Sequence, residues 1–235
     1  MSTFQSSLIS ALPRIMASAA SAAARPGVAY TLGRTLYLSV TNRSNALSIL
    51  KTRGPGFVMP PTSGFRELGD PEPDANELAA VVDECYRNTE IVGMGENDPG
   101  VVFAGAGEPL LRLDVVVDTM RVVRESRHGV PFRVHSNGLH DASVALALAS
   151  AGVDKVTVAL ATADPKQFDA LVKPETTAGD FSTVCGFIAS LAEQGVDVEA
   201  VTVAAPNVDV AAARKLSEAL GASSFRTREY FPSVR

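Results

Sequence analysis

Small and polar residues follow one apolar stretch of this chain in an arrangement that could bind a ligand. The stretch Val101–Ala104 is followed directly by Gly105, Ala106, Gly107, Glu108 and Pro109. Glycine lets a ligand come close to the backbone, and Glu108 adds a carboxylate beside backbone carbonyl groups. These acceptors suit a cationic amine better than a phosphate. The segment is not a dinucleotide-binding G-x-G-x-x-G turn, because the third glycine is absent, and no P-loop lysine follows.

A second candidate is the loop after the apolar stretch Leu36–Val40, which continues to Phe57. A strand that ends in a polar loop with a glycine-rich bend is a common place to hold a cofactor. This loop offers the side chains of Ser44, Ser48 and Lys51. Lys51 and Arg53 together place positive charge there, which could hold an anion.

The three histidines and the C-terminal segment are weaker candidates. His135 lies at a predicted strand end and could act as an acid, a base or a ligand, whereas His128 and His140 are expected in solvated loops. Ser136, His135 and Asp164 have the residue types of a nucleophilic triad, but no G-x-S-x-G elbow surrounds the serine. The final segment, FRTREYFPSVR, could be a lid, a partner surface or a solvated charged edge.

An alternation of strands and helices must position these residues. The predicted strands are Leu36–Val40, Val101–Ala104, Phe132–His135, Lys155–Ala161, Val198–Ala204 and Ser224–Arg228. The predicted helices are Asp74–Asn88, Leu113–Arg124, Asp141–Ala151, Asp180–Gln194 and Asp209–Leu220. Apolar strands between amphipathic helices indicate a parallel sheet with the helices outside. An open doubly wound sheet and a TIM-like barrel of about six β/α units both fit, and both place ligands at the C-terminal ends of the strands.

Composition excludes several classes of protein. The chain has 235 residues, 46% of them hydrophobic, and a net charge of -5, which fits one globular α/β domain and argues against a nucleic-acid binder. No segment approaches the roughly 20 apolar residues that span a membrane. Cys85 and Cys185 lie far apart in helix-like patterns, so neither a disulfide framework nor a zinc site is indicated.

The N-terminal residues 1–33 differ from the rest and are expected to form an extension before a domain of residues 34–235. They are rich in serine and alanine, and the first carboxylate of the chain is Glu67. Segments of this composition are typical of organellar transit peptides, although a helix that covers the core is an alternative. The expected location is therefore the cytoplasm or the mitochondrial matrix.

The order of the motifs resembles the radical SAM superfamily, and within it the TatD-linked radical SAM proteins most closely. The resemblance rests on LYLSVTNRSNALSILKTRGPGF, VVFAGAGEPLLRLD, FRVHSNGL and VTVALATADPKQFDALVKP, and it extends from about Tyr37 to Phe231. It implies a TIM-like partial (β/α)6 barrel. It also implies S-adenosylmethionine (SAM) and a [4Fe-4S] cluster as cofactors, the cluster being held by a CxxxCxxC loop after the first strand.

The resemblance also implies the residues that would contact SAM. The motif that holds the methionine amine falls on Gly105, Gly107, Glu108 and Pro109, and further SAM contacts fall on Ser136 and Asn137. Ala159 and Ala161 stand where relatives carry side-chain donors, and Ala204 and Ala205 would lie near the adenine through their backbone.

The chain departs from the family at the cluster loop, where the three cysteine positions fall on Ser44, Ser48 and Lys51. Iron–sulfur clusters are held by thiolates, whereas a serine hydroxyl stays protonated and a lysine ammonium has no lone pair. The sequence therefore predicts a degenerate member that lacks the metal cluster and retains a SAM pocket.

Two alternatives stay open. One is an active radical SAM enzyme with an unknown substrate. The other is a non-radical barrel enzyme or binding module for an anionic ligand held by Lys51 and Arg53. In each case the expected partner is a small molecule, with a protein partner also conceivable and neither nucleic acid nor membrane expected.

Overall fold

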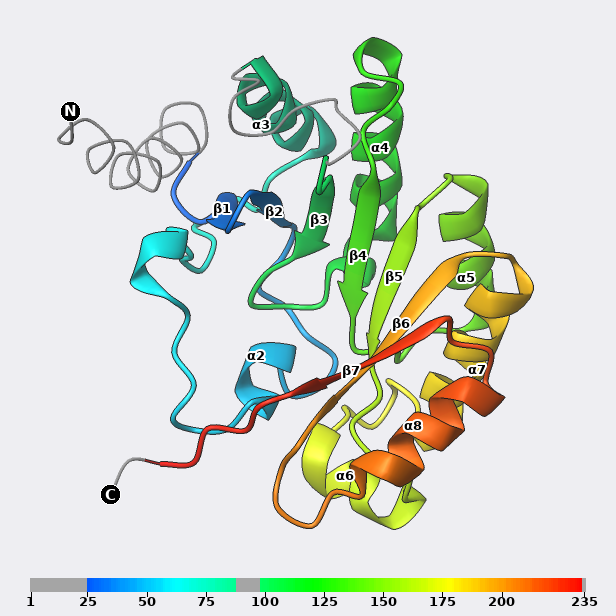
Figure 1. The fold of residues 1–235 in the computed structure, drawn as a ribbon. Helices are drawn as coiled ribbons and strands as arrows, with labels where there is room; N and C mark the ends of the chain where they lie inside the picture. Colours follow the sequence, from blue (N-terminus) through cyan, green and yellow to red (C-terminus); the bar gives the residue numbers. More distant parts are fainter. Residues whose placement is uncertain (1–24, 88–97, 234–235) are drawn as a thin grey trace, which may run out of the picture.

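The computed structural model describes residues 25–87 and 98–233, which form one seven-stranded sheet with its strands in chain order (Figure 1). The strands are β1 (Ala29–Leu32), β2 (Thr35–Ser39), β3 (Val101–Ala104), β4 (Phe132–Ser136), β5 (Lys155–Ala159), β6 (Asp197–Val203) and β7 (Ser224–Arg228). Strands β2 to β7 are parallel, and β1 pairs antiparallel with β2. A doubly wound sheet would reverse its strand order at a switch point. The sequential order therefore selects the predicted partial barrel.

The described helices, apart from the short first one beside the C-terminal segment, connect successive strands along the outer side of the sheet (Figure 1). They are α2 (Ile49–Thr52), α3 (Ala75–Arg87), α4 (Leu113–Ser126), α5 (Ala142–Ser150), α6 (Pro165–Val172), α7 (Phe181–Glu193) and α8 (Val210–Ala219). Two 3-10 turns, η1 (Pro61–Ser63) and η2 (Pro109–Arg112), complete the elements of the described part. The five predicted helices are confirmed, while the short helices α2 and α6 were not predicted.

Aspartates and glycines determine where most of these helices begin and end. The Asp74 carboxylate accepts a hydrogen bond from the backbone N–H of Glu77 at 2.8 Å and so caps the start of α3. Aspartates also cap α5, α6, α7 and α8. Gly152, Gly195 and Gly221 have positive φ angles just after α5, α7 and α8, which turns the chain toward the next strand.

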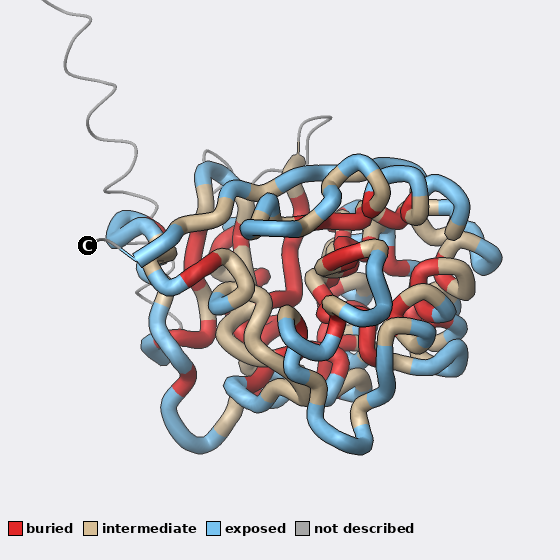
Figure 2. The backbone as a smooth tube through the Cα atoms, turned by 90° about the horizontal axis from the view of Figure 1, so that it is seen from below, coloured by how far each residue is buried: buried red, intermediate tan, exposed pale blue. Residues whose placement is uncertain are grey.

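The apolar core lies between the sheet and these helices, and Figure 2 shows the buried segments enclosed by exposed loops and helix faces. On β4, Phe132 and Val134 point toward the core, whereas Arg133 and His135 alternate with them and are only half-buried. Neighbouring strands continue this polar face, where Lys155 Nζ lies 2.9 Å from Asp197 Oδ2. The inner side of the sheet is therefore more polar than the sequence analysis expected, and it can contact a ligand.

The predicted N-terminal extension is only partly described. Residues 1–24 lie outside the described residues, so their role as a transit segment stays a prediction. Within the predicted range 1–33, β1 joins the sheet through pairs such as Ala29 with Leu38. None of the described helices is long and apolar enough to cross a membrane.

Candidate functional site

Two loops pack against each other at the C-terminal ends of β2 and β3. The backbone N–H of Glu108 donates to the carbonyl of Arg43 at 2.8 Å. A Cβ atom on Gly107 would lie 2.2 Å from the Arg43 carbonyl oxygen, a contact that no side chain can make. Gly107 is therefore required for the approach of the loop that follows β2, and this packing accounts for one of the two glycines of the predicted amine-binding motif.

The three cluster positions come together as the family resemblance implies, although their side chains differ from those of the family. Ser44, Ser48 and Lys51 line one cavity of about 760 Å³, the outer cavity, which Ala106 also lines. The Ser48 hydroxyl donates to the carbonyl oxygen of Ala106 at 2.5 Å and so joins the two loops.

These residues do not fit an iron–sulfur cluster. Two hydroxyl groups and an ammonium replace the thiolates that the cluster needs. Across residues 25–87 and 98–233, no three His, Cys, Asp or Glu side chains gather as a metal site would require. The free thiols of Cys85 and Cys185 lie on α3 and α7, outside the residues that line the outer cavity.

Glu108 is buried, with 1% of its surface exposed, and its carboxylate has partners within the protein. Its Oε2 accepts from the backbone N–H of Asn137 at 2.7 Å, and its Oε1 accepts from that of Leu110 at 3.2 Å. His140 Nε2 lies 3.2 Å from Oε1, and only 7% of the His140 side chain is exposed. The expectation that His140 is a solvated loop residue is therefore wrong. In this structure Glu108 links the ends of β3 and β4, and Pro109 begins η2 directly after it.

The two further SAM-contact residues differ in what they can reach. The Ser136 side chain is fully buried, and its hydroxyl oxygen accepts from the Gly138 N–H at 3.0 Å. The Asn137 amide donates to Asn45 Oδ1 at 2.7 Å, which ties the end of β4 to the loop after β2. Asn137 also lines a narrow cavity of about 50 Å³ together with Ala159, Ala161 and Ala205. The structure thus brings these three alanine positions together beside Asn137.

The residue types of a nucleophilic triad are not brought together. Asp164 is exposed and caps α6 by accepting from the Lys166 N–H at 2.9 Å. Ser136 and His135 are adjacent on β4 and alternate between its two faces. The geometry therefore does not support a nucleophilic triad of Ser136, His135 and Asp164.

A third space, the inner cavity, has a volume of about 500 Å³ and lies on the inner side of the sheet. Its polar lining comes from Tyr30, Tyr37, Arg53, His135 and Arg228, and Gly105 lines it too. Burial, together with the nearby Arg228, Arg226 and Arg133, lowers the pKa of His135 to about 3. His135 is therefore a neutral imidazole at physiological pH, with one ring nitrogen as donor and the other as acceptor.

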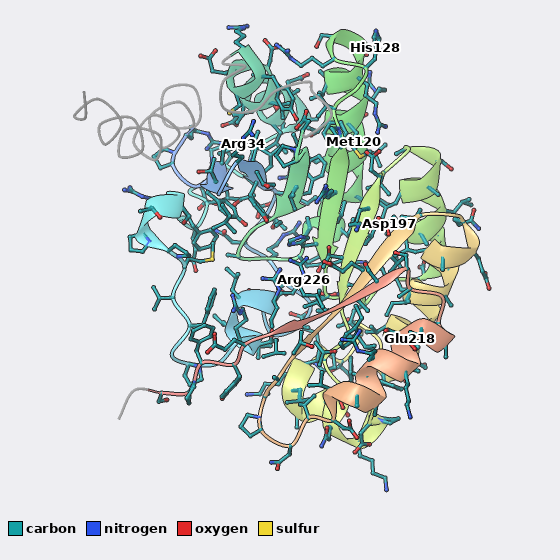
Figure 3. All side chains as sticks on the ribbon, viewed as in Figure 1. Arg34, Met120, His128, Asp197, Glu218 and Arg226 are labelled. Carbon is teal, nitrogen blue, oxygen red and sulfur yellow. The ribbon has the colours of Figure 1, made fainter. Side chains whose placement is uncertain are left out.

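Sequence reasoning missed the role of the C-terminal segment at this cavity. Arg228 and Phe231 both line it, so this part of the segment is not a solvated edge. Figure 1 shows the segment after β7 running past α2. Figure 3 shows His128 at the far end of α4, as expected for a loop residue, and Arg226 on β7, the last strand of the sheet. Lys51 lines the outer cavity and Arg53 the inner one, so the two predicted anion ligands lie apart.

We predict that Gly107→Ala disrupts the junction of the two loops. The added Cβ would collide with the backbone carbonyls of Arg43 and Thr41, at 2.2 and 2.6 Å. Crowding of this kind costs about 1–3 kcal/mol of folding free energy, which urea unfolding would measure. Gly129→Ala is the matched control, because nothing lies within 4 Å of its added Cβ. Equal stabilities of the two variants would contradict the packing described above.

Residues 68–218 match the sequence profile of the Radical SAM superfamily. No curated protein sequence matches this chain. Among solved structures, that of Streptococcus suis SuiB bound to S-adenosylmethionine is similar with a TM-score of 0.58 and 12% identity, covering 83% of this chain and 39% of that one. Methylornithine synthase (PylB) is similar with a TM-score of 0.57 and 16% identity, covering 95% of this chain and 60% of that one.

These similarities establish the family and the fold, and they leave the activity open. The chain spans about two fifths of the length of SuiB. At 12% and 16% identity, the two solved structures support the fold alone. The closer likeness to the TatD-linked proteins stays a prediction. The matched profile covers well over half of the chain, and the protein therefore belongs to the radical SAM superfamily.

Proposed function

We propose that this protein is a radical SAM barrel without a [4Fe-4S] cluster, which binds SAM or a nucleoside of similar size as an intact ligand. The observation that carries the proposal is the lining of the outer cavity. Ser44, Ser48 and Lys51 stand together there in the CxxxCxxC spacing, yet they offer two hydroxyl groups and an ammonium where a cluster needs three thiolates.

The charge of Lys51 strengthens the argument against a cluster. A single serine in place of cysteine would still offer an oxygen, although a weak ligand. A lysine ammonium instead brings a positive charge to the place where an iron would sit. Lys51 is exposed on α2, so water can solvate its charge when no ligand is bound.

The size of the outer cavity supports the binding of a small molecule. Its volume of about 760 Å³ falls within the range of about 300–1,000 Å³ that is usual for ligand sites. Ala106, the second residue of the segment that resembles the amine-binding motif, also lines the cavity. The S. suis SuiB structure holds SAM in a fold of this kind.

Internal hydrogen bonds limit how an amine could bind here. The Ala106 carbonyl accepts from Ser48, and the Glu108 carboxylate accepts from two backbone N–H groups. An incoming methionine amine would have to compete with the Ser48 hydroxyl for the Ala106 carbonyl. We therefore expect SAM to bind more weakly than it would if the Ala106 carbonyl had no hydrogen-bond donor within the protein.

The first prediction concerns the cluster. After anaerobic reconstitution with iron and sulfide, we expect the wild-type protein to stay colourless. The triple variant Ser44→Cys, Ser48→Cys and Lys51→Cys should turn brown and take up about four irons per chain, because it restores the thiolates in a loop that already brings them together. The single variant Ser48→Cys is the control and should take up little iron. Near-stoichiometric iron and sulfide in the wild-type protein would refute the proposal.

The second prediction concerns the amine. Ser48→Ala removes the hydroxyl that occupies the Ala106 carbonyl, so calorimetry should show SAM binding that is tighter by up to about tenfold, the value of one hydrogen bond. The affinity for 5′-methylthioadenosine, which lacks the amine, should not change. Ser150→Ala, at the exposed end of α5, is the control variant. If neither the wild-type nor the variant protein binds SAM or 5′-methylthioadenosine, the proposed pocket is wrong.

A further inference from the structure

Two arginines from distant parts of the chain line the inner cavity together. Arg53 follows directly after α2, and Arg228 is the last residue of β7. Both side chains line the inner cavity, and both also line the narrow cavity that adjoins Ala159 and Ala161. Their positive charges repel each other, and the charge of Arg53 is therefore one of the causes that lower the pKa of Arg228.

Neither guanidinium has a carboxylate partner within ion-pair distance in the described part of the chain. The contrast with Arg226, two residues before Arg228 on β7, is direct, because Arg226 pairs with Glu199. The Nε atom of Arg53 is buried without a hydrogen-bond partner among the described residues. Glu229 acts on Arg53, and Glu199 on Arg228, only at longer range than an ion pair. Burial lowers the pKa of both arginines, which shows that each charge is partly removed from water.

The structure holds the two arginines in place although they repel each other. The Arg53 guanidinium stacks on the ring of Phe57 at 4.1 Å and lies 5.1 Å from that of Phe231. The backbone N–H of Phe231 donates to the Arg53 carbonyl at 2.8 Å, and that of Gly56 donates to the Phe231 carbonyl at 3.0 Å. A Cβ on Gly56 would lie 2.2 Å from the carbonyl oxygen of Pro232, so the C-terminal segment packs closely on the loop after α2.

The rest of the inner cavity suits the body of an organic molecule. Tyr37 and His135 present neutral polar groups, and their rings pack edge to face at 5.9 Å. The apolar lining comes from side chains of several elements, namely Leu32, Ile49, Leu50, Val58, Met59 and Phe231. A molecule with an apolar or aromatic body and one oxyanion would match both parts.

We propose that Arg53 and Arg228 bind the carboxylate or phosphate group of a small organic molecule in the inner cavity. A guanidinium presents parallel N–H donors that match the geometry of both oxyanions. The bound anion would supply the counter-charge that the described protein residues do not provide. Gly105 lines the same cavity, so a molecule in it would also lie beside the end of β3. The proposal does not depend on SAM binding in the outer cavity.

Calorimetry on the full chain tests this site with two probes, inorganic phosphate and benzoate. We expect the wild-type protein to bind at least one of them, and the tighter probe identifies the oxyanion. Arg228→Gln should weaken that binding by tenfold or more. Arg121→Gln, which alters an exposed arginine on α4, should leave the affinity unchanged.

Thermal unfolding separates a binding role from a structural one. Without an anion, Arg228→Gln should raise the melting temperature, because it removes the repulsion with Arg53. Addition of the binding probe should raise the melting temperature of the wild-type protein and not that of the variant. If Arg228→Gln does not fold, Arg228→Lys retains the charge and should still lose most of the affinity.

Two results would overturn the proposal. The first is the absence of binding of both probes to the wild-type protein. The second is equal affinity of the wild-type and Arg228 variants, which would show that the arginine serves the fold alone. Loss of SAM binding with retention of the anion site would remove the proposed function and leave this site standing.

Discussion

The contact between the loop after β2 and the backbone of Gly107 is the constraint on which the rest of the site depends. It brings the Arg43 carbonyl to the N–H of Glu108 and the Ser48 hydroxyl to the Ala106 carbonyl. Because the loop is fixed there, Ser44, Ser48 and Lys51 line one cavity. Because α2 follows directly in the chain, Arg53 comes to lie at the inner cavity, which it lines together with Arg228. The loop held by this backbone contact therefore contributes residues to both cavities.

The same packing holds the shape of the loop after β2 through contacts within the protein. Hydrogen bonds between protein groups hold the loop that carries Ser44, Ser48 and Lys51. Asn42 exchanges two hydrogen bonds with the backbone of Leu68, at 2.8 and 3.0 Å, and Asn45 accepts from the Asn137 side chain at 2.7 Å. These bonds tie the loop to the rest of the barrel at several points. The loss of metal ligands thus does not require the loss of the loop's shape.

Much of the fold could be predicted from the sequence because the signals are local. The aspartate caps, the glycines after α5, α7 and α8, and the short apolar strands each depend on neighbours in the chain. The α6 helix was missed even though Asp164 and Pro165 begin it with ordinary cap chemistry. The strand β1 was missed because its evidence is its pairing with β2 and not its own pattern.

The site could be predicted only in part, because its contacts join distant segments. The sequence order placed Glu108, Asn137 and the cluster positions at strand ends, which the structure confirms. It did not indicate that His140 lies against Glu108. Nor did it indicate that Arg228 lines a cavity together with Arg53, which lies 175 positions earlier in the chain. Packing of the C-terminal segment beside α2 brings that pair together, and no short sequence motif predicts this packing.

The most direct test of the account is whether the protein cleaves SAM reductively. The purified chain would be incubated anaerobically with SAM and a strong chemical reductant, and 5′-deoxyadenosine would be measured by mass spectrometry. We expect no more 5′-deoxyadenosine than in a sample without protein, because Ser44, Ser48 and Lys51 offer no thiolates to hold the cluster that would supply the electron. Formation of 5′-deoxyadenosine in excess over the protein would contradict it and would show that the barrel is an active radical enzyme.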